Sequence, residues 1–553
     1  MSDSSRLSDM SVNDRYCDEL KNRASRHACR CLELAMEGTL VFNDFEDATI
    51  DLTSFDWREG SENRNWWWQL QQLPVFRWYV QSSQLWMPEG RQRDVHEFLV
   101  SVVRNWNSRA NVRRSSSPLV WHDHGSAIRL KHLVDFYALH AARDDDADSK
   151  LLMHHLLVQH VKFLLNRKNY SQNTNHGFEQ AETLYRCGIV FPNNKWMSFA
   201  GHIGQERLTK EIEFAFTSQG VHKENSPGYQ RLMVSKLRAL QALADHSKDE
   251  TFTELDETIR AADRFLSALT LSDGSLPLIG DTRSTDINKQ PAPHSAPPRT
   301  VKIGQIQLHD FSDSGYVIVD YVDTSSGLPG KVVLKCTHLS NYHRHDDDLS
   351  VYWQVGDQCL LGDGGLYSHN EQEFERVFVR SAHAHCVPFI NGVLAERRRQ
   401  KLHRLPTLSL LQDPLRVRGR TWAYSGWCVE RTVYLEKLPG GVVTIDDVVS
   451  RIADRSACAV TNWLLPSAAS VNIEPGRTQL SCGLKNGRSL LFRMDARDEG
   501  SGALYCIHGR GTELRDTGIR ATGFGNWQPA VRICESWPVS KGTRTIIRLG
   551  DAA

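Results

Sequence analysis

The sequence predicts an α+β multidomain protein in which a helical N-terminal half is followed by an antiparallel β-sandwich. Three observations lead to this prediction. Apolar residues recur at helical spacing up to about residue 285, a polar and proline-rich stretch follows, and the apolar period then changes to two. The 553 residues are also too many for one hydrophobic core. We expect a helical domain over 1–285, a linker over 286–300 and a β-sandwich over 301–553.

The helical prediction rests most firmly on two segments. LLMHHLLVQHVKFLL (151–165) places Leu152, Leu156 and Val161 near one helical face, and ETIRAADRFLSALTLSDG (257–274) repeats that pattern. The second segment ends at Asp273-Gly274, a typical stop signal for a helix. Several such segments joined by short polar loops favour a helical array or α/α toroid over a four-helix bundle.

The C-terminal half contains runs in which apolar and polar residues alternate. Such alternation is typical of strands that bury one face. Pro439-Gly440-Gly441 lies between two of these runs and predicts a hairpin turn. The stretch DTRSTDINKQPAPHSAPPRT (281–300) separates the two halves and has the composition of a linker. The predicted strands include 315–322, 331–339, 348–355, 428–449 and 488–495.

Composition limits the partners and the compartment. Lys+Arg and Asp+Glu both total 66, so net charge indicates neither a nucleic-acid nor a membrane partner. Twelve scattered cysteines without a CxxC pair suggest reduced thiols. The N-terminus has no signal-peptide pattern, and no run approaches the roughly 20 apolar residues of a membrane span. We expect a cytoplasmic protein, or a periplasmic or secreted one if an export segment was removed.

The stretch NYHRHDDDLSVYWQVGDQCLLGDGG (341–365) concentrates polar groups beside a predicted strand. Strand alternation would place His343, His345 and Asp347 on one face. A hairpin would then return Asp363 to His345, and a third strand would supply His385 or its rival His383. Two histidines and one carboxylate, with a fourth place for water, are a common zinc set. The alternative is a solvated acidic loop.

Five motifs together resemble the heparinase II/III-like polysaccharide lyases, which include heparinases and oligoalginate lyases. They are HRHDDDLS (343–350), LLGDGGLY (360–367), AHCVPFING (384–392), NHGFEQ (175–180) and NSPGYQ (225–230). The resemblance implies an incomplete α/α toroid followed by an antiparallel β-sandwich. Cys386-Val387 and Asn391 depart from the Asn-Thr and Asp that the family usually has.

The resemblance also implies roles for single residues. His345, Asp363 and His385 would hold a structural Zn²⁺ ion, and His343 would face the substrate. Asn175 and His176 would stand at the cleft of the toroid, and Tyr229 would come from the loop NSPGY. Arg129 would contact substrate, although an ion pair on a helix surface explains it equally well. Packing of Tyr229 under Pro227 and N-capping by Asn175 are the structural alternatives.

The implied chemistry is β-elimination at the bond to O4 of a uronic acid, which leaves a 4,5-unsaturated end. Removal of the C5 proton requires neutralisation of the carboxylate, a base near C5 and an acid at the leaving oxygen. Asn175 can donate to the carboxylate, and Tyr229 can protonate the leaving oxygen. Tyr229 could also be the base if a histidinium lowered its pKa from about 10. His176 and His343 are the other candidate bases, and the sequence does not rank them.

Two other classes of function stay open at this point. A glycoside hydrolase needs two carboxylates flanking the scissile bond, and Glu179, Glu182 and Glu224 are available. A non-catalytic glycan-binding or exopolysaccharide-assembly protein could keep the zinc scaffold. In each case the expected partner is an acidic poly- or oligosaccharide. The particular glycan, endo or exo attack and a homodimer stay open. The basic run ERRRQKLHR (396–404) could meet such a glycan or form a solvated loop.

Overall fold

The computed structural model describes residues 9–42, 45–57, 63–86, 89–111, 117–140, 147–247, 252, 255–288, 300–451, 453–454, 456–466, 468–473, 479–496 and 503–550. The chain divides into two compact units. One contains Met1–Ala215 and Ala239–Thr253, and the other contains Phe216–Arg238 and Glu254–Ala553. The predicted boundaries at 285 and 300 stay a prediction, because most of the linker, 289–299, lies outside the described residues.

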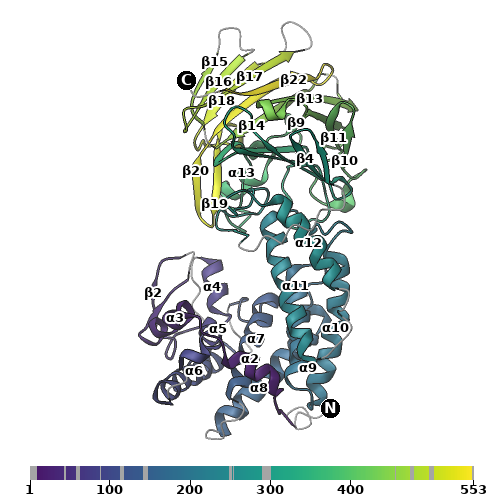
Figure 1. Ribbon diagram of the computed structural model, residues 1–553. Helices are drawn as coiled ribbons and strands as arrows, with labels where there is room; N and C mark the ends of the chain where they lie inside the picture. The colour runs from purple at the N-terminus through teal and green to yellow at the C-terminus, as the bar shows by residue number, and fades with distance from the viewer. Residues whose placement is uncertain are drawn as a thin grey trace. The chain divides into compact units, whose positions relative to one another are not determined.

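The first unit is helical (Figure 1). Its helices are α2 (Asp14–Lys21), α3 (Arg26–Met36), α4 (Arg64–Leu70), α5 (Pro74–Gln81), α6 (Glu89–Arg109), α7 (Asp123–His140), α8 (Ala147–Leu165), α9 (Asn175–Val190) and α10 (Lys195–Ala215). Helix α11 (Pro227–Ser247) begins in the second unit and ends in the first, and α12 (Leu255–Leu269) belongs to the second. The helices predicted over 151–165 and 257–274 are confirmed as α8 and α12. The toroidal arrangement stays a prediction.

Helices α9 and α10 pack closely because small residues line their contact. A Cβ added at Gly188 would lie 2.8 Å from the Cα of Gly201, so neither position has room for a side chain. The start of α9 is fixed by Thr174, whose hydroxyl accepts a hydrogen bond from the Gly177 amide. Within the described residues, no helix is both long and apolar enough to cross a membrane.

The second unit is built from antiparallel strands. A six-stranded sheet has the order β3-β4-β5-β6-β7-β8, and an eight-stranded sheet has the order β10-β11-β12-β13-β22-β17-β16-β15. Two smaller sheets are β18-β21-β14-β9 and β19-β20. Side chains from the three larger sheets, including Val319, Val417 and Trp463, share one buried core. Together with the helical unit, this architecture confirms the predicted order of a helical part and an antiparallel sheet part.

The strands have these bounds: β3 (Thr300–Ile303), β4 (Ile306–Phe311), β5 (Tyr316–Val322), β6 (Pro329–Lys335), β7 (Ser350–Val355), β8 (Gln358–Leu361), β9 (Pro388–Ile390), β10 (Thr407–Gln412), β11 (Leu415–Thr421), β12 (Cys428–Tyr434), β13 (Val442–Arg451), β14 (Cys458–Leu465), β15 (Ala468–Ile473), β16 (Gln479–Leu484), β17 (Ser489–Ala496), β18 (Ala503–His508), β19 (Ile519–Gly523), β20 (Asn526–Pro529), β21 (Val531–Pro538) and β22 (Thr543–Gly550). The short β1 (Thr39–Leu40) and β2 (Ala48–Thr49) pair within the first unit. The turn predicted at Pro439-Gly440-Gly441 joins β12 to β13.

The expectation that His343, His345 and Asp347 share a strand face is wrong. Strand β6 ends at Lys335 and β7 starts at Ser350, so these residues lie in the loop between the two strands. The loop has left-handed backbone at His343 (φ 52°) and Leu349 (φ 70°). Its polar side chains have buried partners of their own, including the ion pair of Asp347 with Lys335. These contacts override the strand pattern.

Candidate active site

The centre of the site is Asp281, a buried residue in the segment that follows α12. One of its carboxylate oxygens accepts from His343 Nδ1 (2.7 Å), and the other accepts from His345 Nε2 (2.8 Å). The guanidinium of Arg376, on α13 (Phe374–Arg380), donates to both oxygens at 2.5 and 3.1 Å. Burial raises the pKa of Asp281, but Arg376 and the histidines outweigh it and hold that pKa well below its usual range. Asp281 is therefore a fixed carboxylate.

His343 and Tyr229 form a stacked pair beside Asp281. Their ring centroids lie 3.8 Å apart with an interplanar angle of 25°. Because Asp281 is ionised, it sets the tautomer of His343 by accepting the Nδ1 proton. In the neutral imidazole Nε2 would then carry the lone pair, and it lies 3.4 Å from Glu224 Oε2. The left-handed backbone of His343 (φ 52°) is uncommon for a residue with a Cβ.

Tyr229 lies in the first turn of α11 and not in a loop. Burial raises its pKa well above 10, and the neighbouring carboxylates of Asp281 and Glu224 raise it further. Arg376 and Arg283 oppose this shift only in part. The environment therefore favours the neutral phenol. It does not provide the lowered pKa that a base role would require.

The predicted zinc ligands come together. His345, Asp363 and His385 are fully buried, and their ligand atoms lie within 4.8 Å of one another. His385 Nδ1 is 2.9 Å from Asp363 Oδ2. Among the described residues, however, neither atom has a partner in hydrogen-bond geometry, and nor do His345 Nδ1 and His385 Nε2.

Such buried polar atoms are costly unless something binds them, and two imidazoles with one carboxylate suit Zn²⁺. The residues present therefore fit a metal ion. Burial lowers the pKa of His345 to about 4, so its imidazole is neutral, as metal binding requires. Asp281 supplies the outer carboxylate that typically orients a ligating histidine.

His383, the rival ligand, lies outside this group. Its Nδ1 is 3.3 Å from the guanidinium of Arg532. The structure therefore brings together His345, Asp363 and His385. Cys386, which replaces the usual asparagine, directs its thiol to the carbonyl of Gly362 at 3.3 Å.

Asn175 and His176 start helix α9 in the first unit. Thr174 and not Asn175 caps this helix, which corrects the capping alternative. His176 Nδ1 lies 3.2 Å from Asp123 Oδ2, and its ring stacks on His124 at 4.2 Å. Burial raises the pKa of Asp123, but hydrogen bonds with His122 and His176 hold it well below its usual range. His122 Nδ1 also lies 2.9 Å from Asp123 Oδ1.

Arg129 does not lie where the sequence analysis expected it. Its side chain has 0% exposed surface and makes neither a surface ion pair nor an accessible substrate contact. Its guanidinium donates to His160 Nε2 at 2.8 Å and to the carbonyls of Gln71 at 2.6 Å and Val120 at 2.7 Å. Arg129 therefore cross-links helices and loops inside the first unit.

The three glutamates considered for hydrolysis lie in different surroundings. Lys131 lies 3.3 Å from Glu179 and 3.2 Å from Glu182, and Glu182 also pairs with Arg186. Both glutamates are buried on helix α9. Glu224 is different, because it lies beside His343 in the second unit.

The sequence analysis missed four features of the site or its surroundings: Asp281, Arg376, His369 and the position of Glu224 next to His343. His369 is exposed, with its ring 5.7 Å from His343. Asp281, His343 and His369 have ligand atoms within 4.8 Å of one another. A metal fits poorly there, because the Asp281 oxygens already accept from Arg376 and two histidines. Asp281 fell in the stretch interpreted as a linker, so no sequence signal marked it.

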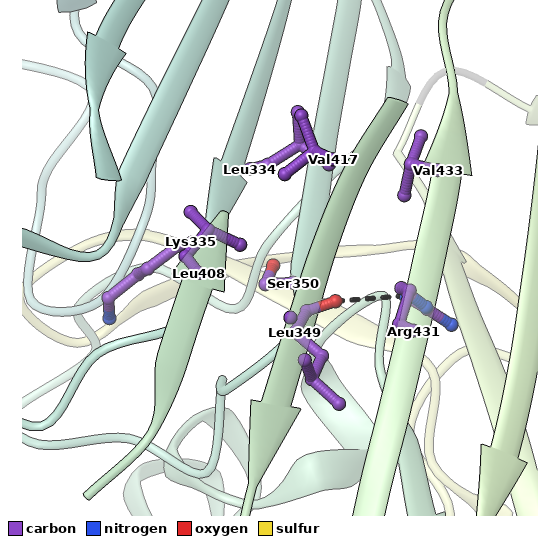
Figure 2. A pocket seen from close by; sticks show the side chains of 9 residues that line it. Leu334, Lys335, Leu349, Ser350, Leu408, Val417, Arg431 and Val433 are labelled. Carbon is purple, nitrogen blue, oxygen red and sulfur yellow. Dashed lines mark hydrogen bonds between the residues drawn. The ribbon is translucent and has the colours of Figure 1, made fainter. Parts of the chain in front are cut away.

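A small pocket inside the sandwich contains Arg431 and the end of the loop that carries His343 (Figure 2). Arg431 donates to the carbonyl of Leu349 at 3.0 Å and to that of Cys386 at 2.5 Å, and it pairs with Asp447. It therefore fixes the end of the His343 loop beside the segment that carries His385. The other lining residues are mostly apolar: Leu334, Lys335, Ser350, Leu408, Val417, Gly419 and Val433.

This combination of a helical unit, an antiparallel β-sandwich and a tyrosine–histidine pair is the arrangement expected of a two-part polysaccharide lyase. The family model for the heparinase II/III N-terminus matches residues 8–294, and the model for the heparinase II/III-like C-terminal domain matches residues 304–547. The chain belongs to the heparinase II/III family. This membership confirms the resemblance that we inferred from the sequence motifs.

Solved structures show the same fold. A crystal structure of heparinase III superposes with a TM-score of 0.75 at 15% identity, covering 97% of this chain and 86% of that one. Heparan sulfate lyase HepC from Pedobacter heparinus gives 0.65 at 13% identity, with 97% and 87% covered. The BT4657 heparinase III gives 0.67 at 14% identity, with 96% and 85% covered. No curated protein matches the sequence.

Proposed function

We propose that the protein cleaves an acidic, uronate-containing glycan by β-elimination, with His343 as the base and Tyr229 as the acid. The observation that carries this proposal is the stack of Tyr229 on His343, with Asp281 behind the imidazole. Two of the solved relatives are titled heparinase III and heparan sulfate lyase, which supports an acidic glycan as substrate.

In the proposed reaction, His343 Nε2 takes the C5 proton of the uronate. The imidazolium that forms gains a favourable interaction with the Asp281 carboxylate at Nδ1. The electron pair from the C5–H bond forms the C4=C5 double bond, and the C4–O4 bond breaks. Tyr229 gives its proton to the departing O4, and the raised pKa of the phenol keeps that proton in place until the reaction. Asn175 and His176 remain the predicted partners of the uronate carboxylate, on the motif alone.

We infer a structural role for zinc. His345, Asp363 and His385 would hold the ion, which would cross-link their three segments. Because His345 also donates to Asp281, an ordered His345 would keep the carboxylate in place behind His343. His343 itself would stay free to face the substrate.

The hydrolase alternative is weaker. It needs one carboxylate to activate water and a second one to protonate the leaving oxygen. Asp281 has both oxygens engaged by Arg376 and two histidines, and Glu179 and Glu182 are held in buried ion pairs. Glu224 alone cannot supply both functions.

The test is a panel of acidic polysaccharides, namely heparin, heparan sulfate, chondroitin sulfate, hyaluronan and alginate, incubated with the purified protein. Elimination leaves a conjugated C4=C5 bond that absorbs in the ultraviolet. Absorbance growth with at least one polymer, abolished by His343→Ala, is the expected result. Reducing ends without absorbance would support hydrolysis instead. Binding without either signal would support a non-catalytic protein.

A further inference from the structure

The outer face of the eight-stranded sheet carries a row of arginines on β11. Arg416, Arg418 and Arg420 alternate with Val417, which is buried in the sandwich core, and with Gly419. Residues two apart on a strand lie about 7 Å from each other on the same face. The three guanidinium groups therefore form a line along the edge region of the sheet.

The row continues beyond the strand. Trp422 follows β11 directly, and the guanidinium of Arg404 lies 4.7 Å above the centre of its ring. Arg404 ends the basic run 396–404 and is exposed. Strand β10 pairs with β11 so that Thr407 is opposite Arg420, which brings the end of the basic run beside the row. Arg404, Trp422, Arg420, Arg418 and Arg416 are called the arginine row below.

The charge of this row is incompletely balanced. Glu430 on β12 lies 2.6 Å from Arg418 and 2.5 Å from Arg420, so one carboxylate serves two guanidinium groups. Asp446 on the same sheet face is paired with Arg544 at 2.6 Å. Within the part of the chain that the structure describes, the row thus has four guanidinium groups and one carboxylate, Glu430, which pairs with two of them. In a chain with no net charge, this is a local excess of three positive charges.

The basic run also contacts the segment that leads to the catalytic histidine. Arg397 makes a two-pronged contact with Asp346, at 2.7 Å for each oxygen. The amide of Arg399 donates to Asn341 Oδ1 at 2.6 Å, and Asn341 Nδ2 donates to Gln400 at 3.1 Å. The run is therefore fixed to both sides of His343 along the chain, while Arg398, Arg399, Lys401 and Arg404 are exposed.

We propose that the arginine row is a second, non-catalytic binding site for an acidic polysaccharide. Guanidinium groups bind carboxylate and sulfate through paired hydrogen bonds, and a line of them suits a linear polyanion. Trp422 adds an aromatic surface on which a sugar ring can pack. The site would hold a stretch of chain remote from the reacting uronate and so keep a long substrate bound. This inference rests on the proposed function for its choice of ligand.

The test compares two triple variants in a Tyr229→Phe background that prevents cleavage. R404Q/R416Q/R418Q removes three charges of the row, and R93Q/K210Q/K485Q removes three exposed charges elsewhere. Titration with heparan sulfate and with alginate at low salt should show about tenfold weaker binding for the first variant and no change for the control. The difference should shrink at high salt, because screening weakens exposed charge pairs. Equal affinity of the two variants would overturn the proposal.

A kinetic comparison tests the same site with cleavage intact. With otherwise wild-type protein and a long polymer, the row variant should raise KM several-fold and leave kcat unchanged. A tetrasaccharide held at the His343 site leaves little chain over for a second site, so its KM should change less than that of the long polymer. Equal KM values of the row variant and the wild type for the long polymer would contradict the proposal. Binding of a DNA duplex as tightly as the glycans would also contradict it.

The outcomes separate this proposal from the lyase assignment. If no polymer produces ultraviolet absorbance but binding still depends on the row, the lyase proposal fails and the binding site stands. If absorbance grows but binding does not depend on the row, the lyase proposal stands and the binding-site proposal fails. Should the triple variant unfold, the single variant Arg404→Gln, on an exposed loop, must still weaken binding more than Arg93→Gln does.

Discussion

The Nδ1 atom of His343 lies 2.7 Å from an oxygen of Asp281, and the other oxygen of that carboxylate lies 2.8 Å from His345. One buried group therefore joins the proposed base to a proposed zinc ligand. Because Arg376 also donates to both oxygens, Asp281 cannot turn to favour one histidine over the other. The position and tautomer of His343 are thus fixed before substrate binds.

Replacing Asp281 by asparagine should damage catalysis far more than the small change in shape suggests. The amide introduced by Asp281→Asn could donate to His343 and select the wrong tautomer, and it could not stabilise the imidazolium. We expect kcat to fall about 10²–10⁴-fold, with a smaller change in KM. Initial rates of absorbance growth would measure this. Asp413→Asn, which changes an exposed carboxylate on the same unit, is the matched control and should keep full activity. A near-normal kcat for Asp281→Asn would remove the carboxylate from the mechanism.

Tyr229→Phe should abolish elimination while the fold stays intact. Only the proton donor is lost, and the ring can still stack on His343. We expect kcat to fall about 10²–10⁴-fold, with an unchanged circular dichroism spectrum. Tyr505→Phe, which removes a partly exposed phenol on β18, serves as the control. Normal turnover by Tyr229→Phe would exclude the phenol as the acid.

The raised pKa of Tyr229 also predicts a pH dependence of stability. Since the folded state holds this proton more tightly than the unfolded chain does, the phenol favours folding fully below its unfolded pKa of about 10. That contribution is lost as pH rises above about 10. Urea unfolding at pH 8 and pH 11 should therefore show a larger loss of stability for wild type than for Tyr229→Phe. Equal losses in the two proteins would mean that Tyr229 titrates normally.

Removing a zinc ligand should release the metal and loosen the site. His345→Ala and His385→Ala should each lose bound zinc, measured by elemental analysis, and lower Tm by about 5 °C or more. His383→Ala is a sharp control, because it lies two residues from His385 and outside the cluster. A chelator should lower Tm of the wild type and of His383→Ala alike. Full metal occupancy in His345→Ala would refute the ligand assignment.

Periodicity predicted much of the fold, because helices α8 and α12 and strands such as β5 follow their local apolar pattern. Strand alternation failed for His343, His345 and Asp347, which it placed on one strand face and which lie in a loop. There Asp347 pairs with Lys335, and His343 turns to Asp281. Specific partners of this kind decide the local backbone, and alternation of residue types does not reveal them.

The candidate site, like the fold, was predicted only in part from the sequence. Motif spacing selected His345, Asp363 and His385, which the structure places within reach of one ion. Asp281 was missed because it is 62 residues from His343 in the chain and belongs to no period or motif. Arg129 was misplaced for the opposite reason. A helical pattern gives its spacing but not whether its guanidinium points to solvent or to the carbonyls of Gln71 and Val120.

The burial of Arg129 predicts a stability effect without a kinetic one. Arg129→Gln would leave His160 and the carbonyls of Gln71 and Val120 without their charged donor, inside a unit that excludes water. Losing such a network typically costs about 3–5 kcal/mol of unfolding free energy. Urea titration should show this loss, while KM for a cleaved oligosaccharide should stay within about twofold of wild type. Arg93→Gln, whose exposed partner is Glu97, should change neither quantity. A large rise in KM at unchanged stability would instead return Arg129 to the substrate-binding residues.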